Sequence, residues 1–180
     1  MSDMDIDQRD VSIRPGDERD VAAVVALMDG AVEWLVAAGR TDQWGTDPYS
    51  ADPRRVAAIS SMAVGRELYV AVSGDIVVGA LAVGSAMSYV PPAAEPELYV
   101  RLLVTDRGCA GRGIGGRLLE HARTIARAGG VELLRVDCYA GPDGALIRYY
   151  EKQGFTATDS FEVARPSGPW SGQVLQQRLT

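Results

Sequence analysis

The chain has few of the residues from which common catalytic centres are built. Of its 180 residues only two are cysteine and one is histidine, His121. Two cysteines, Cys109 and Cys138, are too few for a disulfide framework, and their spacing fits no zinc pattern. With a single histidine, a His-based triad and a His-ligated metal site are nearly excluded. We therefore expect no metal at the functional site.

Long apolar runs and an excess of basic residues are also missing. No run approaches the ~20 apolar residues needed to cross a membrane, and the acidic start over 1–7 is not a signal peptide. We therefore expect a cytoplasmic protein that does not act on membranes. The net charge of −6 argues against a general nucleic-acid binder and weakly favours cationic partners such as amines.

Hydrophobic residues make up 47% of the chain, which is enough to form the core of a domain of this length. Residues 1–10 are polar, and we expect a frayed tail there, ahead of one domain over 11–180. Apolar spacings of three and four predict a helix capped by Asp17 and stopped by Gly39. Further helices are predicted over 53–64, 115–128 and 145–153.

Alternating and continuous apolar segments predict seven strands. The turn at 73–75 joins two of them in a hairpin, so these two pair antiparallel. The resulting order, β-α-α-β-β-β-α-β-α-β-β, places the chain in the α/β (α+β) class, with a mixed sheet flanked by helices. The predicted strands cover 11–14, 67–72, 76–83, 98–104, 131–138, 155–163 and 173–179.

The most informative segment is 110–116, AGRGIGG, between the strand over 98–104 and the helix over 115–128. Glycine allows the backbone to approach a ligand closely, and the start of a helix adds unpaired N–H donors and the positive end of a dipole. This combination predicts an anion site, for which phosphate is the usual ligand. A glycine-rich turn that only packs a helix on the sheet would carry a large entropic cost for four glycines.

Gly111, Gly113 and Gly116 also match the dinucleotide fingerprint, with Asp137 about 20 residues further on. However, residues 105–110 separate the strand from Gly111, whereas the dinucleotide turn follows its strand directly. The preceding strands form a hairpin rather than βαβ units. An NAD-binding protein is therefore the weaker hypothesis, and a P-loop is excluded because no Gly-Lys-Ser/Thr is present.

A second motif, YYEKQGF at 149–155, lies one strand and one helix beyond the glycine loop. With Leu102-Leu103-Val104 and GRGIG at 111–115, it resembles the GCN5-related N-acetyltransferase (GNAT) superfamily. The resemblance covers about 11–180 in element order, with its motifs confined to 98–155. It implies the acyl-CoA N-acyltransferase fold, whose central sheet is mainly antiparallel. It also implies acetyl-CoA as co-substrate and an amine of a small molecule or peptide as acceptor.

The same resemblance assigns the cofactor-binding residues. In this family the strand before the loop splays away from its neighbour, so that its backbone pairs with the pantetheine amides, and one N–H can hold the developing oxyanion. The loop backbone holds the pyrophosphate. The residues so assigned are Leu102, Leu103, Val104, Ala110, Gly111, Arg112, Gly113, Ile114, Gly115 and Gly116.

Two positions depart from the family pattern. Ala110 occupies the place of the family's Arg or Gln, and one extra residue precedes it. Arg107 or Arg112 could supply the missing charge, or backbone N–H groups could suffice. Asp143 stands where the family often has an asparagine that contacts the cofactor arm.

For the chemistry, Tyr150 has the spacing of the family's general acid, which returns a proton to the leaving thiolate. Tyr149 faces about 100° away on the helix and is expected in the core or at the rim. Glu97 and Asp137 are the candidate bases for the acceptor ammonium. Glu97 is preferred because family members often carry a glutamate near that place, and the alternative for each is a solvated or ion-paired carboxylate.

Acceptor specificity is expected in the irregular segments 40–45, 85–96 and 164–172. Trp44 and Trp170 could form an aromatic wall there or simply cap the core. Cys109 is expected as a buried filler rather than a reactive thiol, and His121 as a surface residue. The sequence does not decide whether the protein forms a homodimer. It also leaves a second class of function as an alternative, a non-catalytic acyl-CoA sensor.

Overall fold

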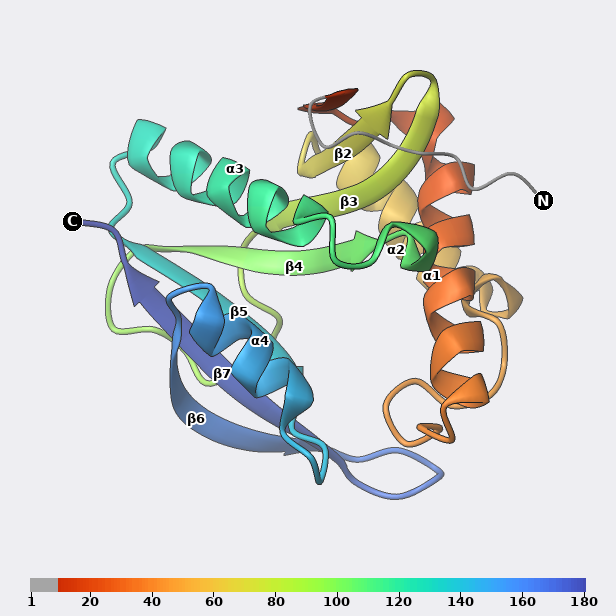
Figure 1. Cartoon of the computed structure of the whole chain (residues 1–180). Helices are drawn as coiled ribbons and strands as arrows, with labels where there is room; N and C mark the ends of the chain where they lie inside the picture. Colours follow the sequence, from red (N-terminus) through yellow and green to blue (C-terminus); the bar gives the residue numbers. More distant parts are fainter. Residues whose placement is uncertain (1–9) are drawn as a thin grey trace.

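The computed structural model describes residues 10–180, and its centre is one seven-stranded sheet with helices on both faces (Figure 1). The strand order is β1-β2-β3-β4-β5-β7-β6, and β4 and β5 form the parallel pair in an otherwise antiparallel sheet. The mixed, mainly antiparallel sheet expected from the sequence is therefore confirmed. The strands are β1 (Val11–Pro15), β2 (Leu68–Ser73), β3 (Ile76–Gly84), β4 (Glu97–Thr105), β5 (Leu133–Tyr139), β6 (Thr156–Val163) and β7 (Trp170–Arg178).

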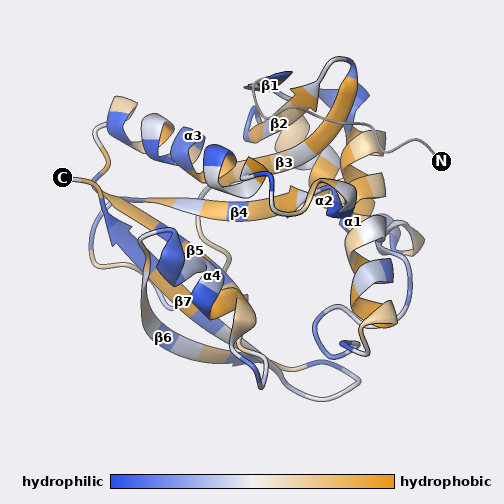
Figure 2. Ribbon diagram, viewed as in Figure 1, coloured by the Kyte–Doolittle hydropathy of each residue, from blue (hydrophilic) through white to orange (hydrophobic). Residues whose placement is uncertain are grey.

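The helices form two layers with separate apolar cores. One core lies between the sheet and α1 and α2, and the other lies between the sheet and α3 and α4. Figure 2 shows hydrophobic residues concentrated along the central strands and α1, while α3 and α4 carry hydrophilic outer faces. The helices are α1 (Val21–Ala37), α2 (Pro53–Val64), α3 (Ile114–Ala128) and α4 (Ala145–Lys152), with short 3-10 turns η2 (Glu18–Asp20), η3 (Tyr49–Ala51) and η4 (Arg107–Cys109).

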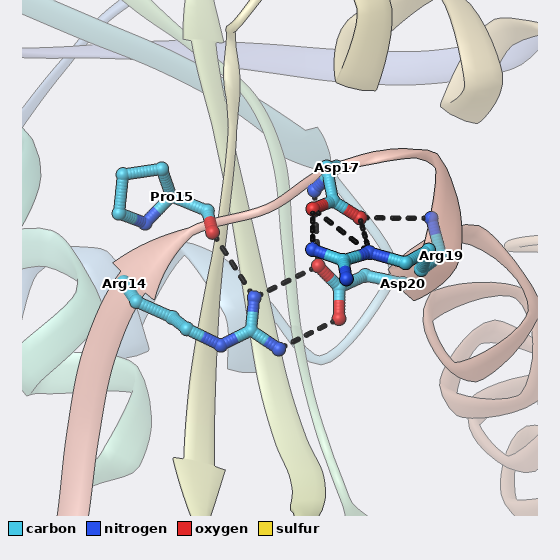
Figure 3. A network of polar contacts seen from close by, with 5 residues as sticks. All are labelled: Arg14, Pro15, Asp17, Arg19 and Asp20. Carbon is cyan, nitrogen blue, oxygen red and sulfur yellow. Dashed lines mark hydrogen bonds and ion pairs between the residues drawn. The ribbon is translucent and has the colours of Figure 1, made fainter.

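The first helical segment begins with the cap that the sequence predicts. The Asp17 carboxylate accepts from the backbone N–H of Arg19, and the Asp20 carboxylate accepts from the N–H of Asp17 at 2.9 Å. Arg14 on β1 donates two hydrogen bonds to Asp20, at 2.9 and 2.8 Å (Figure 3). This network ties β1 to the start of α1 and satisfies a carboxylate that is 7% exposed.

The structure differs from the predicted elements at their ends. Residues 1–9 of the expected tail lie outside the described part. The last strand begins at Trp170, three residues earlier than predicted, because Trp170 pairs with Val163 to close the β6–β7 hairpin. The prolines and glycines of 166–172 conceal this pairing in the sequence. Within residues 10–180, no helix is both long and apolar enough to span a membrane.

The feature that positions the site is a split in the middle of the sheet. β4 and β5 pair only where residues 97–100 meet 133–136. Beyond that point β4 continues along β3, and β5 continues along β7, so that the two strands diverge (Figure 1). A bulge leaves Arg101 without a partner on β3, and bulges bend the strand that carries them. The result is a V-shaped opening between adjacent central strands.

Candidate active site

A cleft of about 810 Å³ occupies the V between β4 and β5. Its walls come from the diverging halves of these strands, the glycine loop, the start of α4 and the end of α1. Segments far apart in the sequence therefore meet around one space. The predicted site residues that line it are Leu102, Leu103, Val104, Ala110, Gly111, Gly113, Ile114, Gly115, Gly116 and Tyr150, whereas Arg112, Asp143 and Glu97 do not.

One wall of the cleft is backbone. Leu102, Leu103 and Val104 pair with β3 on one side, but they lie beyond the last residue of β4 that pairs with β5. A fully paired central strand, which the apolar side chains alone suggest, is not what the structure has. The edge facing the V therefore offers peptide groups to an extended ligand, in the way that a neighbouring strand would.

The glycine loop brings the start of a helix to the same cleft. Gly111 and Gly113 have φ of 79° and 71°, a region that side-chain-bearing residues rarely adopt. Gly113 is the N-cap of α3 and has no side chain with which to cap it. The N–H groups of Ile114, Gly115 and Gly116 therefore have no acceptor within the helix. They supply the converging donors and the positive dipole end that a phosphate requires.

A third glycine is required by close packing. A Cβ atom on Gly115 would lie 2.3 Å from the Tyr149 hydroxyl oxygen. Tyr149 was expected in the core or at the rim, and it lines the cleft with its hydroxyl against the first turn of α3. A Cβ on Gly116 would meet the flexible end of Gln153 at 3.3 Å, which is a milder constraint.

The structure distinguishes the two arginines that could replace the family's loop charge. Arg107 lines the cleft and lies over the ring of Trp34, 3.6 Å from its centroid. Arg112 does not line the cleft, and Ala110 lines it without contributing charge. Arg107 is therefore the better placed cation beside the loop.

Tyr150 projects from α4 into the core between α3, α4 and the sheet, at the edge of the cleft. It is 7% exposed and packs against the rings of Phe155 and Tyr149, with centroids 5.7 and 5.2 Å apart. Burial raises the pKa of its hydroxyl, and the neighbouring Cys138 thiol raises it further. The hydroxyl therefore stays protonated at neutral pH, as a proton donor must.

The two candidate bases lie in different places. Glu97, the preferred one, is at the paired start of β4, where Arg135 binds it at 2.8 Å, and it does not reach the cleft. Asp137 directly follows Val136, the last residue of β5 that pairs with β4, and it lines the cleft. β4 and β5 separate only beyond Val100, so Glu97 lies in the paired part of the sheet and Asp137 in the open part. In the sequence, Asp137 is the one carboxylate of the segment Leu133–Tyr139.

Asp137 is held by one short hydrogen bond in a largely buried setting. The Tyr99 hydroxyl donates to its Oδ1 at 2.5 Å. Burial raises the pKa of the Asp137 carboxyl, and the Tyr99 hydrogen bond opposes that rise without cancelling it. A carboxylate with a raised pKa is a stronger base than an exposed aspartate.

The acid and base candidates lie on opposite faces of the sheet. Side chains alternate along a strand, so Asp137 points away from Val136 and Cys138. These two belong to the core under α3 and α4, together with Tyr150. Asp137 instead shares the face of Tyr99, which packs under the 85–96 loop. The V therefore lies between two faces of the sheet, with the Tyr150 hydroxyl on one face and the Asp137 carboxylate on the other.

The remaining predicted residues take structural positions. The Asp143 carboxylate lies outside the cleft lining. It accepts a hydrogen bond from the Ala145 backbone N–H at 3.1 Å and forms an ion pair with Arg40 at 2.8 Å. Cys109 is buried, and burial raises its thiol pKa, which opposes reactivity. His121 was expected at the surface but is partly buried against Tyr69, with no hydrogen bond to Nε2 within the described part of the chain.

The acceptor segments meet across the mouth of the cleft. Trp170 Nε1 donates to the Gln43 carbonyl at 2.9 Å, and both Trp44 and Trp170 line the cleft. Sequence reasoning missed Tyr89, Arg101 and Arg165, which line it as well. They come from separate loops and a bulge, so no spacing in the sequence links them.

Comparison with known proteins gives a consistent result. The sequence profile of the Acetyltransferase (GNAT) family matches residues 31–155. A mycothiol acetyltransferase of Beutenbergia cavernae is 44% identical over 68 residues, which are 37% of this chain and 22% of that protein. This chain therefore matches less than a quarter of that relative's length.

Two solved structures superimpose on nearly the whole chain. A proposed phosphinothricin N-acetyltransferase has a TM-score of 0.69 and 25% identity, covering 94% of this chain and 99% of its own. The protein yncA from Salmonella typhimurium, with its cofactor acetyl-CoA, has a TM-score of 0.67 and 22% identity, covering 94% of both chains. Since the family profile matches more than half of the sequence, the chain belongs to the GNAT acetyltransferase family.

Proposed function

We propose that the protein binds acetyl-CoA in the V and transfers the acetyl group directly to a primary amine. The observation that carries the proposal is one cleft that joins the open start of α3 to the unpaired edge of β4. These two features match the two polar parts of the co-substrate, a diphosphate and a chain of amides. The presence of acetyl-CoA in the yncA structure supports this choice of ligand.

The chain's own groups fit that ligand by their chemistry. The N–H groups of 114–116 would hold the diphosphate, with Arg107 beside them. The peptide groups of 102–104 would pair with the amide arm and point it through the V. One N–H of this edge would stabilise the negative charge that develops on the carbonyl oxygen during attack.

Proton transfer completes the reaction. Asp137 would take a proton from the acceptor ammonium, directly or through a water, so that the amine nitrogen can bond to the acetyl carbon. The bond from that carbon to sulfur then breaks, and Tyr150 would donate its proton to the thiolate sulfur. The nitrogen loses its second proton as the amide forms, and solvent carries a proton back to the Tyr150 oxygen and takes the proton held by Asp137. The raised pKa of Asp137 makes it a stronger base. The raised pKa of Tyr150 keeps its hydroxyl protonated but makes it a weaker acid, so the proton would pass to sulfur only as the thiolate charge develops. The products are an N-acetyl amine and free CoA, with no covalent enzyme intermediate.

The test is release of the CoA thiol in the presence of a panel of primary amines. We expect Tyr150→Phe and Asp137→Asn each to lower kcat by 10²- to 10⁴-fold, the usual range for a lost acid or base, while acetyl-CoA affinity stays within a few-fold. Tyr49→Phe and Asp75→Asn are matched controls outside the cleft and should behave as wild type.

Two results would contradict the mechanism. Full turnover by Tyr150→Phe across the pH range would remove its role as acid. Tight binding of acetyl-CoA without transfer to any amine would instead favour a non-catalytic acyl-CoA-binding module.

A further inference from the structure

Charged side chains gather at the part of the cleft that faces the 85–96 loop. Tyr89, Arg101, Asp137 and Arg165 all line the cleft, and we refer to these four residues as the acceptor end. They lie on the 85–96 loop, β4, β5 and the β6–β7 connection.

Tyr89 lies within electrostatic reach of the other three side chains. Tyr89 is 47% exposed, and partial burial is the main cause of the raised pKa of its hydroxyl. The charge of Asp137 raises that pKa further, while the charges of Arg165 and Arg101 lower it. One hydroxyl therefore experiences a carboxylate and two guanidinium groups. Any molecule that fills this space is exposed to both signs of charge.

The two arginines differ in how their charge is balanced. Arg101 is ion-paired with Glu67 at 2.6 Å. Arg165 has no carboxylate within ion-pair distance in the part of the chain that the structure describes. Its contacts are the Gln43 carbonyl at 3.3 Å and the ring of Trp170, 4.9 Å from the centroid.

Arg165 is partly buried in a setting that favours an anionic ligand. Partial burial lowers the pKa of its guanidinium, and the nearby Arg55 lowers it further. A guanidinium that has lost part of its hydration gains more from a counter-charge than a fully exposed one does. Its planar fork of donors matches a carboxylate in a bidentate arrangement.

We propose that the acceptor is a free amino acid or a close analogue, with its amine at Asp137 and its carboxylate bound by Arg165. This inference rests on the proposed function, because it takes Asp137 as the base that faces the amine. An amino acid carries an ammonium and a carboxylate close together, which is the charge pattern opposite to that of the acceptor end. A polyamine would bring a second cation towards Arg165, and a lysine side chain would bring no carboxylate.

The test compares amino acids with the amines that remain after their carboxylate is removed. Phenylalanine, methionine and arginine are paired with phenethylamine, 3-(methylthio)propylamine and agmatine, and CoA release gives kcat/KM for each. For the side chain that the cleft accepts, we expect the amino acid to be preferred by at least tenfold. Arg165→Gln should reduce kcat/KM for the amino acid by about ten- to a hundredfold, the range for a lost charge-assisted hydrogen bond, and leave the paired amine unchanged.

Two further variants separate charge from folding. Arg165→Lys keeps the positive charge and should retain part of the preference, although it loses the bidentate fork. Arg54→Gln removes a fully exposed arginine outside the cleft and should change nothing. Equal or reversed preference within every pair, or a preference that survives in Arg165→Gln, would overturn the inference while transfer to amines still stands.

Failure of the proposed function is seen separately. It would appear as no CoA release with any of the six acceptors. Calorimetry of the same six compounds with the acetyl-CoA-loaded protein then decides the inference. Binding of an amino acid that Arg165→Gln abolishes would support it, and the absence of Arg165-dependent binding would overturn it.

Discussion

The contact between Gly115 and Tyr149 can be tested by a double-mutant cycle. In Gly115→Ala the new Cβ would lie 2.3 Å from the Tyr149 hydroxyl oxygen. A normal contact needs about 3.5 Å, so the ring or the first turn of α3 must move by roughly 1 Å. Overpacking of this kind costs about 1–3 kcal/mol, and the better helix propensity of alanine offsets about 1 kcal/mol. We expect a net loss of up to about 2 kcal/mol.

The hydroxyl alone causes the clash, so its removal should reverse the sign. In Tyr149→Phe the nearest side-chain atoms to the new Cβ are the ring Cζ at 3.5 Å and Thr105 Cγ2 at 3.9 Å, both ordinary contacts. Gly115→Ala in this background should then stabilise the fold by up to about 1 kcal/mol. The coupling energy between the two positions should be about 1–3 kcal/mol.

Urea denaturation of the four proteins measures this coupling. Gly116→Ala is the matched control, because its Cβ meets only the movable end of Gln153. Additive effects of Gly115→Ala and Tyr149→Phe would refute the packing that the structure shows at the start of α3.

Three further predictions concern charge and backbone. Asp137→Asn should raise Tm at pH 7, because burial raises the pKa of the Asp137 carboxyl in the folded state above the ordinary 3.8 and its ionised form destabilises the fold. The difference in Tm between the variant and the wild type should vanish below pH 3.8, where the carboxyl is protonated in both the folded and the unfolded state. Thermal melts at several pH values measure this difference. Asp20→Asn should act oppositely. The hydrogen bonds from Arg14 lower the pKa of the Asp20 carboxyl, so the ion pair should stabilise the fold by about 1–2 kcal/mol above pH 3.8 and lose this effect as the pH falls. An equal gain in Tm in Asp137→Asn and Asp20→Asn would contradict this contrast. Gly113→Val should weaken acetyl-CoA binding, because valine strongly disfavours a φ of 71°; unchanged affinity by calorimetry would refute the assignment of the loop.

The sequence predicts the elements well where local physics decides them. The capping by Asp17, the turn at 73–75 and the glycines after α3 are local signals, and each marks an element boundary in the structure. Trp170 is different, because its strand exists only through pairing with Val163. No property of residues 166–172 alone reveals that partner.

The site divides in the same way. Short motifs in the sequence single out the glycine loop and Tyr150, and the structure places both at the cleft. The choice between Glu97 and Asp137 depends on where two strands separate, and only the three-dimensional pairing defines that point. The residues of the acceptor end are not linked by any sequence spacing either, because Tyr89 and Arg165 line one cleft from two loops that are distant in the sequence.

The central claim is that the V binds acetyl-CoA. Its most direct test is a thermal shift of the wild-type protein and of Gly113→Val with acetyl-CoA, CoA and NADH at equal concentration. A ligand at a hundredfold excess over its Kd should add about 2.7 kcal/mol of stability. The account predicts a rise in Tm with both CoA species, none with NADH, and a reduced rise in Gly113→Val. A rise with NADH alone would contradict it and assign the glycine loop to a dinucleotide.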